Sequence, residues 1–160
     1  MVRLAHPGAE LGAPRRAAPG VRFSGASWAG RIPGMTEWGD VAAECADLVA
    51  ADRGRVLDGS PASLEVLDEV CQELVAEGPL EGDRLDLWTV LVGAYTGEVV
   101  VREFGGTWVT HDGAPAISAL GITGFPFGLA HRILTGEPFK SLASFARTLP
   151  AVAERSREAP

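Results

Sequence analysis

The chain has 160 residues and 46% of them are hydrophobic, which is enough for one domain with a buried core. Residues 1–34 hold five arginines and one glutamate, a sum of +4, whereas the remainder holds 9 basic and 20 acidic residues, a sum of −11. An acidic body of this kind repels phosphate backbones, so we expect no nucleic-acid partner. No apolar run reaches the ~18 residues of a membrane span, so we expect no membrane segment either.

Residues 1–34 differ in character from the rest of the chain. They are rich in Gly, Pro, Ala and Arg, show no periodicity, and lack the apolar core of a secretory signal. We expect a disordered extension here, and Met35, where periodic sequence begins, is a candidate for the biological start. Residues 36–150 are expected to form a single globular domain, and residues 151–160 a polar tail.

The first expected helix spans about residues 37–52. Its apolar residues recur at intervals of three and four, the spacing of one helix face, with Thr36 placed to cap it and Gly54 to end it. Cys45 lies on its apolar face, and Cys71 lies on that of the next helix. Two such cysteines without a CxxC pair predict no zinc site and are typical of reduced thiols in a cytoplasmic protein; a disulfide between the two helices is the alternative.

A second helix is expected from Ser60-Pro61, an N-cap and N1 pair, to about Glu77. Its inner face is apolar and its outer face is acidic. The simplest interpretation of the acidic face is a solvated surface. The residues that form this face are Glu65, Asp68, Glu69, Glu73 and Glu77.

The longest apolar periodic stretch of the chain predicts a central helix over about residues 84–104. Asp83 is a suitable N-cap, and Gly105 with the glycine after it provides a stop. The helix is apolar over most of its circumference, which is typical of a helix packed on several sides. Three consecutive valines also allow a strand, but length and capping favour helix. Gly93 and Gly97, at a helix cost of about 1 kcal/mol each, would let another backbone approach closely.

Glu98 interrupts the apolar face of this central helix. A buried carboxylate without a partner is costly, so we expect Glu98 to be paired. Arg102, one turn later, is the nearest candidate. Trp108, His111 and His131 are the alternatives. The favoured interpretation is a structural carboxylate that ties the helix to the following hairpin. The alternative is a small enzyme in which Glu98 acts as general acid or base beside one of the two histidines.

Alternating apolar positions follow the central helix. They predict two short strands within about residues 107–119, joined by an Asp112-Gly113 turn, which is a strong hairpin combination. Gly121 and Gly124 are interpreted as a loop. These residues therefore predict a small antiparallel hairpin that packs on the central helix.

Two more helices complete the expected domain. Phe125-Pro126 opens one that runs to about Thr135, and Ser141 caps a last one that Pro150 closes. With about five helices and one hairpin, the expected fold class is α+β, mainly helical. No internal repeat is present in this range.

Four motifs of the second half occur in a recognisable order. They are GAYTGEV at residues 93–99, GGTWV at 105–109, FPF at 125–127 and HRILTGE at 131–137. This order, over about residues 85–149, resembles a pattern shared by small uncharacterised bacterial proteins of the domain-of-unknown-function families. The resemblance implies a bacterial protein of similar fold and implies no particular chemistry. Some similar small acidic proteins lie in toxin-immunity neighbourhoods, which is an analogy for function.

No catalytic, metal or nucleotide motif stands out in the sequence, so we expect no cofactor. This, together with the acidic helical surface, favours a protein-binding module of the immunity or inhibitor kind over an enzyme. Its partner would be a basic protein, steered by Glu69 and Glu73. The sequence leaves the oligomeric state open. The other candidate binding residues are Tyr95, Glu98, Arg102 and Trp108.

Overall fold

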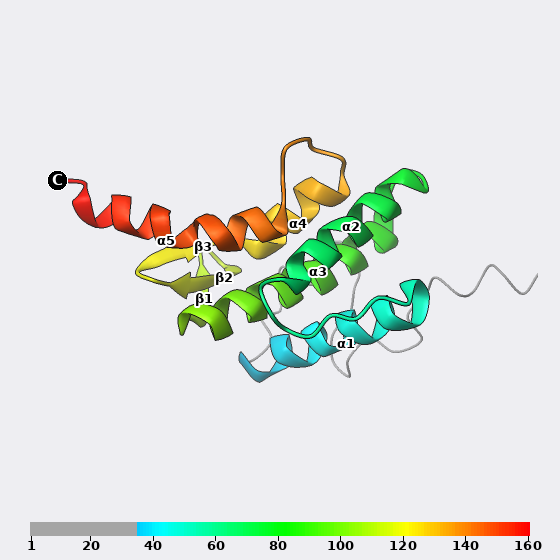
Figure 1. The fold of residues 1–160 in the computed structure, drawn as a ribbon, viewed down its shortest axis with the longest axis horizontal. Coiled ribbons are helices and arrows are strands. Elements are labelled where there is room, and N and C mark those ends of the chain that lie inside the picture. Colours follow the sequence, from blue (N-terminus) through cyan, green and yellow to red (C-terminus); the bar gives the residue numbers. More distant parts are fainter. Residues whose placement is uncertain (1–34) are drawn as a thin grey trace, which may run out of the picture.

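The computed structural model describes residues 35–160, without the side chains of the first two, so the expectations for residues 1–34 lie outside it. The described chain has mainly helical α+β architecture, as expected (Figure 1). None of its helices is long and apolar enough to cross a membrane. The elements in order are α1 (Met35–Arg53), α2 (Ser63–Ala76), α3 (Gly82–Phe104), β1 (Thr107–His111), β2 (Ala114–Ala119), β3 (Ile122–Gly124), α4 (Pro126–Leu134) and α5 (Leu142–Glu158).

Helix α3 is central, as its all-round apolar sequence predicts. It packs chiefly on α1 and α4, and its far end leads into the sheet (Figure 1). From Leu87 to Val100 every residue is buried except Glu98, which is half-buried. Gly105 ends the helix in the left-handed conformation with φ 67°, the stop that the sequence predicts.

The sheet has three antiparallel strands in the order β1-β2-β3. Asp112 and Gly113 form the expected turn, both with positive φ (49° and 78°). The interpretation of Gly121 and Gly124 as a loop is wrong. Gly121 instead lies in a second tight turn with Leu120, again with both φ values positive (81° and 55°), and the next three residues add a third strand.

Three aromatic side chains pack against one side of α3. Trp38, Trp108 and Phe127 lie with ring centroids 4.8–5.7 Å apart; we call them the aromatic cluster. A Cβ at Gly93 would stand 2.4 Å from a ring carbon of Phe127 and 2.9 Å from its Cα, so a backbone does approach closely here, as expected. At Gly97 the neighbour is an indole instead: a Cβ would stand 2.2 Å from Trp108. The two glycines therefore make room for the aromatic cluster.

Helix starts differ from expectation at three places. α1 begins one residue before Thr36, which therefore lies inside the helix and is not the N-cap. The N-cap of α3 is Glu81, not Asp83, and its side chain makes no capping hydrogen bond. α2 begins at Ser63, whose N–H donates to the Ser60 hydroxyl at 3.3 Å. Short polar residues fit several positions near the start of a helix, so the sequence alone does not show which of them is the N-cap.

Pro150 does not close α5. The helix continues through the proline to Glu158, so residues 151–160 are not the polar tail expected. Ala153 is buried within this extension, and the end of α5 projects beyond the sheet in Figure 1. A proline removes one backbone hydrogen bond, and the alanine, glutamate and arginine residues around it are strong helix formers.

The start of α5 is held by a residue of α2. Ser141 caps α5 as expected, accepting from the N–H of Ser144 at 3.1 Å. Asp68 accepts three more hydrogen bonds there: from the Ser141 hydroxyl at 2.7 Å and from the N–H groups of Leu142 and Ala143 at 2.7 and 3.1 Å. Asp68 is thus a helix cap and not part of a freely solvated face.

Candidate functional site

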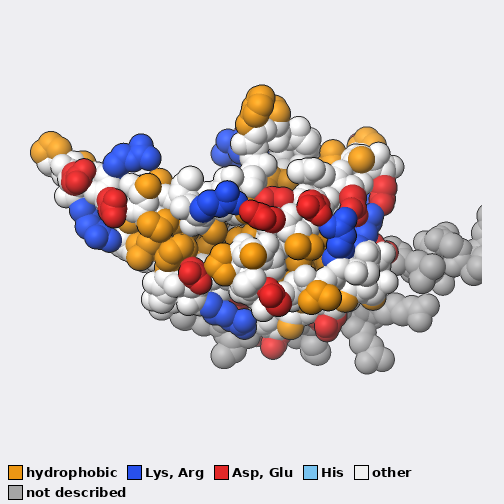
Figure 2. Space-filling model, viewed as in Figure 1, with side chains coloured by type: hydrophobic (Ala, Val, Ile, Leu, Met, Phe, Trp, Pro, Cys, Tyr) orange, Lys and Arg blue, Asp and Glu red, His pale blue; other side chains and the backbone are white. Residues whose placement is uncertain are grey.

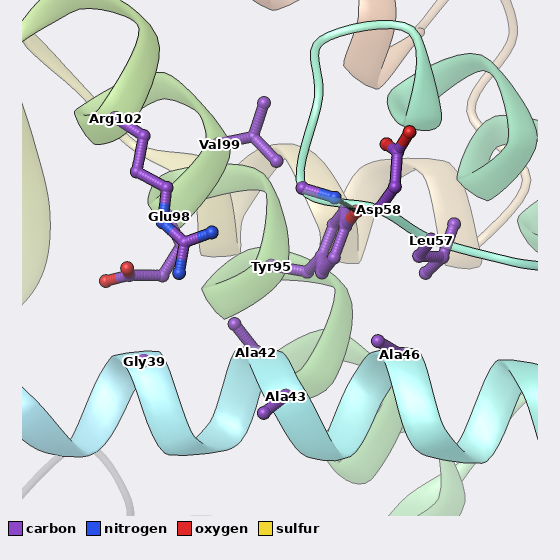
Figure 3. A pocket seen from close by; sticks show the side chains of 11 residues that line it. Gly39, Ala42, Ala43, Ala46, Leu57, Asp58, Tyr95, Glu98, Val99 and Arg102 are labelled. Atoms are coloured by element: carbon purple, nitrogen blue, oxygen red, sulfur yellow. Dashed lines mark hydrogen bonds between the residues drawn. The ribbon is translucent and has the colours of Figure 1, made fainter.

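An open cavity of about 230 Å³ lies between α1 and α3, and we call it the α1–α3 groove (Figure 3). One wall is the run of small residues on α1, and the opposite wall is α3 with the chain after α1. Three of the residues proposed from the sequence, Tyr95, Glu98 and Arg102, lie in it together. The residues that line it are Gly39, Ala42, Ala43, Ala46, Leu57, Asp58, Gly59, Tyr95, Glu98, Val99 and Arg102.

Glu98 is fixed at one end of the groove by the hairpin. The indole Nε1 of Trp108 donates to its Oε1 at 2.7 Å, so Trp108 is the partner, and the nearest sequence candidate, Arg102, is not. The other oxygen, Oε2, points toward α1, 3.8 Å from where a Cβ at Gly39 would stand. The described residues give Oε2 no hydrogen bond. One carboxylate oxygen thus anchors the fold and the other faces the groove.

Arg102 reaches into the same end of the groove. It lies one helical turn after Glu98, yet no ion pair joins the two side chains; in Figure 3 the guanidinium lies beside Glu98. Its Nη1 lies 3.0 Å from where a Cβ at Gly59 would stand, so Gly59 leaves room for it. Among the described residues, Arg102 has no carboxylate within ion-pair distance. This end of the groove therefore carries an exposed cation, Arg102, and a carboxylate oxygen, Oε2 of Glu98, that has no hydrogen bond among the described residues.

Tyr95 forms the floor of the groove and offers a ring, not a reactive hydroxyl. Its hydroxyl accepts from the N–H of Gly59 at 2.8 Å and lies 2.6 Å from the Ser63 hydroxyl. Burial raises the pKa of the Tyr95 hydroxyl, which keeps it neutral. The pair of bonds also fixes the loop after α1 against α3, so the groove has a rigid wall.

Gly39 is a helix glycine that packing does not require. Among the described residues, a Cβ there would meet only the Glu98 carboxylate, at ordinary contact distances of 3.8–4.0 Å. Its backbone is helical, where a glycine is about 1 kcal/mol less favourable than an alanine. The effect of the glycine is to keep the wall of α1 open opposite Glu98.

The two candidate histidines lie elsewhere. His131 lines a separate cavity of about 420 Å³ with Asp86 and Thr89. His111 lies at the hairpin turn, its Nε2 3.5 Å from Asp112 and its ring centroid 5.4 Å from that of Phe125. Neither histidine lines the α1–α3 groove, so the structure does not bring together the acid and base that the enzyme hypothesis needs.

The acidic face of α2 is largely ion-paired. Arg55 binds both Glu69 and Glu73, the latter at 2.7 Å. Arg53 binds Glu77, through Nη2 at 3.0 Å and through Nη1, and lies 3.6 Å from Glu73. Acidic and basic side chains interleave on the face that Figure 2 presents. Glu69 and Glu73, two of the binding residues proposed from the sequence, are therefore not unpaired steering charges.

A fully exposed aromatic residue lies in the connection between α4 and α5, residues 135–141, which we call the α4–α5 loop. Phe139 is fully exposed and has a φ of 61°, a conformation that bulky residues rarely adopt. The loop around it is braced: Glu137 lies 3.9 Å from Arg132 and 3.6 Å from Lys140. Figure 2 shows hydrophobic side chains at its projecting tip. Nothing in the sequence pattern singles out this residue.

Unpaired acidic residues lie at the same end of the molecule. Asp86 of α3 and Arg132 of α4 line the 420 Å³ cavity, so the start of α3 is close to the base of the α4–α5 loop. Glu81 and Asp83 are exposed at that start. No ion pair within residues 35–160 engages any of these three carboxylates. Their negative charges lie near the N-terminus of α3, where the helix dipole stabilises them.

The two cysteines are buried free thiols in α1 and α2. Burial raises the pKa of both Cys45 and Cys71, so both are held as neutral thiols. No group of three or more metal-ligating side chains is close enough to hold an ion within the described part of the chain. The two cysteines are therefore buried packing residues of the core, as the sequence predicts.

Comparison with known proteins identifies no relative of this chain. No family model, no curated protein and no solved structure matches it. The resemblance that the motifs of residues 85–149 suggest thus stays a prediction. The features that bear on function are the α1–α3 groove, the α4–α5 loop and the unpaired carboxylates at the start of α3.

Proposed function

We propose that the protein is a protein-binding module for a basic partner, of the immunity or inhibitor kind. The observation that carries this proposal is Phe139, a fully exposed aromatic side chain on a braced loop. The contact surface would be the α4–α5 loop together with the acidic start of α3. We also place the protein in the cytoplasm, because its two buried thiols are free.

Phe139 has the properties of an anchor residue. Burying such a side chain in a partner's pocket supplies a large apolar area at small cost in side-chain freedom, which is why aromatic residues are enriched in interfaces. Its backbone conformation costs about 1–2 kcal/mol relative to a glycine, a cost that loops usually avoid. The strain therefore supports a role for the side chain outside the fold.

Charge supports a basic partner. Residues 35–160 carry 9 basic and 20 acidic residues, and six of the cations are already engaged in ion pairs. The unpaired carboxylates Glu81, Asp83 and Asp86 lie at the start of α3, which is close to the base of the α4–α5 loop. A basic protein would be attracted over distances near the Debye length, about 10 Å at 0.1 M salt. Steering would come from these residues, with Glu69 and Glu73 contributing less than the sequence suggests.

The test is affinity capture from the native host with the full chain as bait, using wild type and Phe139→Ser. We expect a basic protein that wild type retains and Phe139→Ser loses. The matched control is Val56→Ser, because Val56 is also largely exposed, at 77%, but lies on another loop. Retention by wild type and by Val56→Ser, with loss by Phe139→Ser, supports the proposal.

The purified pair then tests the electrostatic half of the proposal. We expect the association rate to fall steeply with salt and to fall about tenfold in an Asp83→Asn, Asp86→Asn variant at low salt. A partner bound equally by Phe139→Ser would exclude the anchor. An association rate independent of salt would exclude steering.

A further inference from the structure

We propose that the α1–α3 groove binds the α-carboxylate and the neighbouring nitrogen of an amino acid with an apolar side chain. Arg102 would hold the carboxylate, and Oε2 of Glu98 would accept from the nitrogen. This site is separate from the protein-binding surface proposed above, which involves the α4–α5 loop. It adds a small-ligand function to the same chain.

The groove presents both signs of charge without pairing them. Glu98 and Arg102 are spaced one turn apart, the arrangement that normally forms an ion pair on a helix surface. Here the indole of Trp108 holds Glu98 at 2.7 Å, and Arg102 lies in the groove without an ion pair among the described residues. A ligand that carries an anion and a donor close together satisfies both side chains at once.

The spacing of the two groups fits one amino acid. Residues four apart on a helix have Cβ atoms about 5–6 Å apart, and the two side chains converge on the same end of the groove (Figure 3). The carboxylate and nitrogen of an amino acid share a single α-carbon, so they can meet both groups without strain. Arginine is suited to a carboxylate because its N–H groups bind it in a bidentate manner.

The other end of the groove is apolar. Tyr95, Val99 and Leu57 supply its surface, and Ala42 and Ala46 keep the facing wall of α1 low. Asp58 also lines the groove, but in Figure 3 its carboxylate points away from the Glu98 end, and its Oδ1 accepts from the N–H of Ser60 at 3.0 Å. An apolar side chain of the ligand would lie against this surface.

The size of the groove limits the ligand. Its volume of about 230 Å³ is below the range of about 300–1,000 Å³ typical of sites for drug-sized molecules. Gly39 contributes to this volume without a packing reason of its own. A carboxylate with a neighbouring N–H donor is offered by a free amino acid and by the last residue of a peptide chain. The two sources differ at the nitrogen, which is a charged ammonium group in the first and a neutral amide that carries the rest of the chain in the second.

The experiment is isothermal titration calorimetry of the full chain with four probes: L-leucine, N-acetyl-L-leucine, L-alanyl-L-leucine and L-leucinamide. We expect a carboxylate-bearing probe to bind and leucinamide to bind about ten- to hundredfold more weakly. Tightest binding by leucine identifies a free amino acid as the ligand, whereas binding by the acetylated or dipeptide probe at least as tight identifies a chain end. Leucinamide binding as tightly as the tightest of the three carboxylate probes would overturn the proposal, as would no heat from any carboxylate probe at millimolar concentration.

Variants locate the site. Arg102→Gln and Glu98→Gln should each lower the affinity for the tightest-binding probe about ten- to hundredfold. Glu98→Gln keeps an oxygen for Trp108, so its fold should be retained, which near-ultraviolet circular dichroism checks. Gly39→Leu should fill the groove and abolish binding.

Two controls separate this site from other surfaces. Arg155→Gln removes an exposed arginine on α5, outside the groove, and should leave the affinity unchanged. Phe139→Ser should also leave it unchanged, which keeps this proposal independent of the protein-binding one. Unchanged affinity in both Arg102→Gln and Gly39→Leu would show that the probe binds elsewhere and would refute the site.

Discussion

The two sides of α3 are built in opposite ways. On one side Gly93 and Gly97 are pressed against the aromatic cluster, and no atom could be added there. By helical spacing, Tyr95 and Val99 lie on the other side, where the helix faces the α1–α3 groove. Across that groove Gly39 has room for a side chain that it does not carry.

The difference separates two uses of glycine within helices. In α3 each glycine weakens the helix locally, and the aromatic contacts that replace its side chain offset that cost. In α1, Gly39 weakens the helix, and no contact from residues 35–160 replaces its missing side chain. Gly93 and Gly97 are explained by the aromatic rings that pack against them. Gly39 instead lies where the structure leaves open space for a side chain.

The largest effect is expected at the closed side. Gly97→Ala would place a Cβ 2.2–2.4 Å from two indole carbons of Trp108, so the ring must move. We expect the free energy of unfolding to fall by about 3 kcal/mol, the upper end for overpacking, measured by urea denaturation. A loss below about 0.5 kcal/mol would mean that the aromatic cluster is loosely held and that the contrast between the two sides is wrong.

Trp108→Phe should have the next largest effect. It keeps an aromatic ring in the cluster but removes the N–H that holds Oε1 of Glu98 at 2.7 Å. Hydrogen bonds to charged groups contribute about 1.5–3 kcal/mol, so we expect a loss of about 2 kcal/mol in thermal or urea unfolding. The loss should shrink when Glu98 is already Gln, a double-mutant comparison that isolates the bond.

Thr96→Val should stabilise the protein. Thr96 is fully buried, and its hydroxyl has no hydrogen-bond partner among residues 35–160. Replacing an unsatisfied buried hydroxyl with a methyl group removes a desolvation penalty, and we expect a gain of about 1 kcal/mol and a higher Tm. A decrease in Tm would indicate that the hydroxyl is bonded in solution.

Gly39→Ala should produce the smallest change, also a gain. The added methyl group meets no close neighbour in the described part of the chain, and alanine favours the helix by up to about 1 kcal/mol. We therefore expect the free energy of unfolding to rise by roughly 0.5 kcal/mol in urea. The opposite signs expected for Gly97→Ala and Gly39→Ala are the sharpest form of the comparison. A loss at Gly39 would mean that the groove closes in solution.

Much of the fold follows from sequence periodicity. The central helix, its glycine stop, the Asp112-Gly113 turn and the Ser141 cap are all confirmed, because each depends on residues adjacent in the chain. The third strand was missed because it has only three residues and follows a Leu120-Gly121 turn, a pair without the usual asparagine or aspartate. The continuation of α5 through Pro150 was missed because helix propensity outweighed one lost bond.

The candidate site was only half predictable. Helical spacing brings Tyr95, Glu98 and Arg102 to one face, so local sequence information was sufficient to group them. The ion pairs of Glu69 and Glu73 depend on arginines 14–20 residues earlier in the chain, whose approach only the tertiary fold decides. Phe139 lacks any periodic context, and its exposure depends on how the loop leaves α4.

The cap that Asp68 places on α5 joins residues 73–75 positions apart, which gives the chain an order of assembly. At about 5–20 residues per second, α2 is synthesised several seconds before Ser141. Until then the Asp68 carboxylate and the apolar side of α2 have no partner from α5. The helix that covers this side of α2 is therefore the last to be synthesised, and a chain that stops before α5 leaves that side of α2 uncovered.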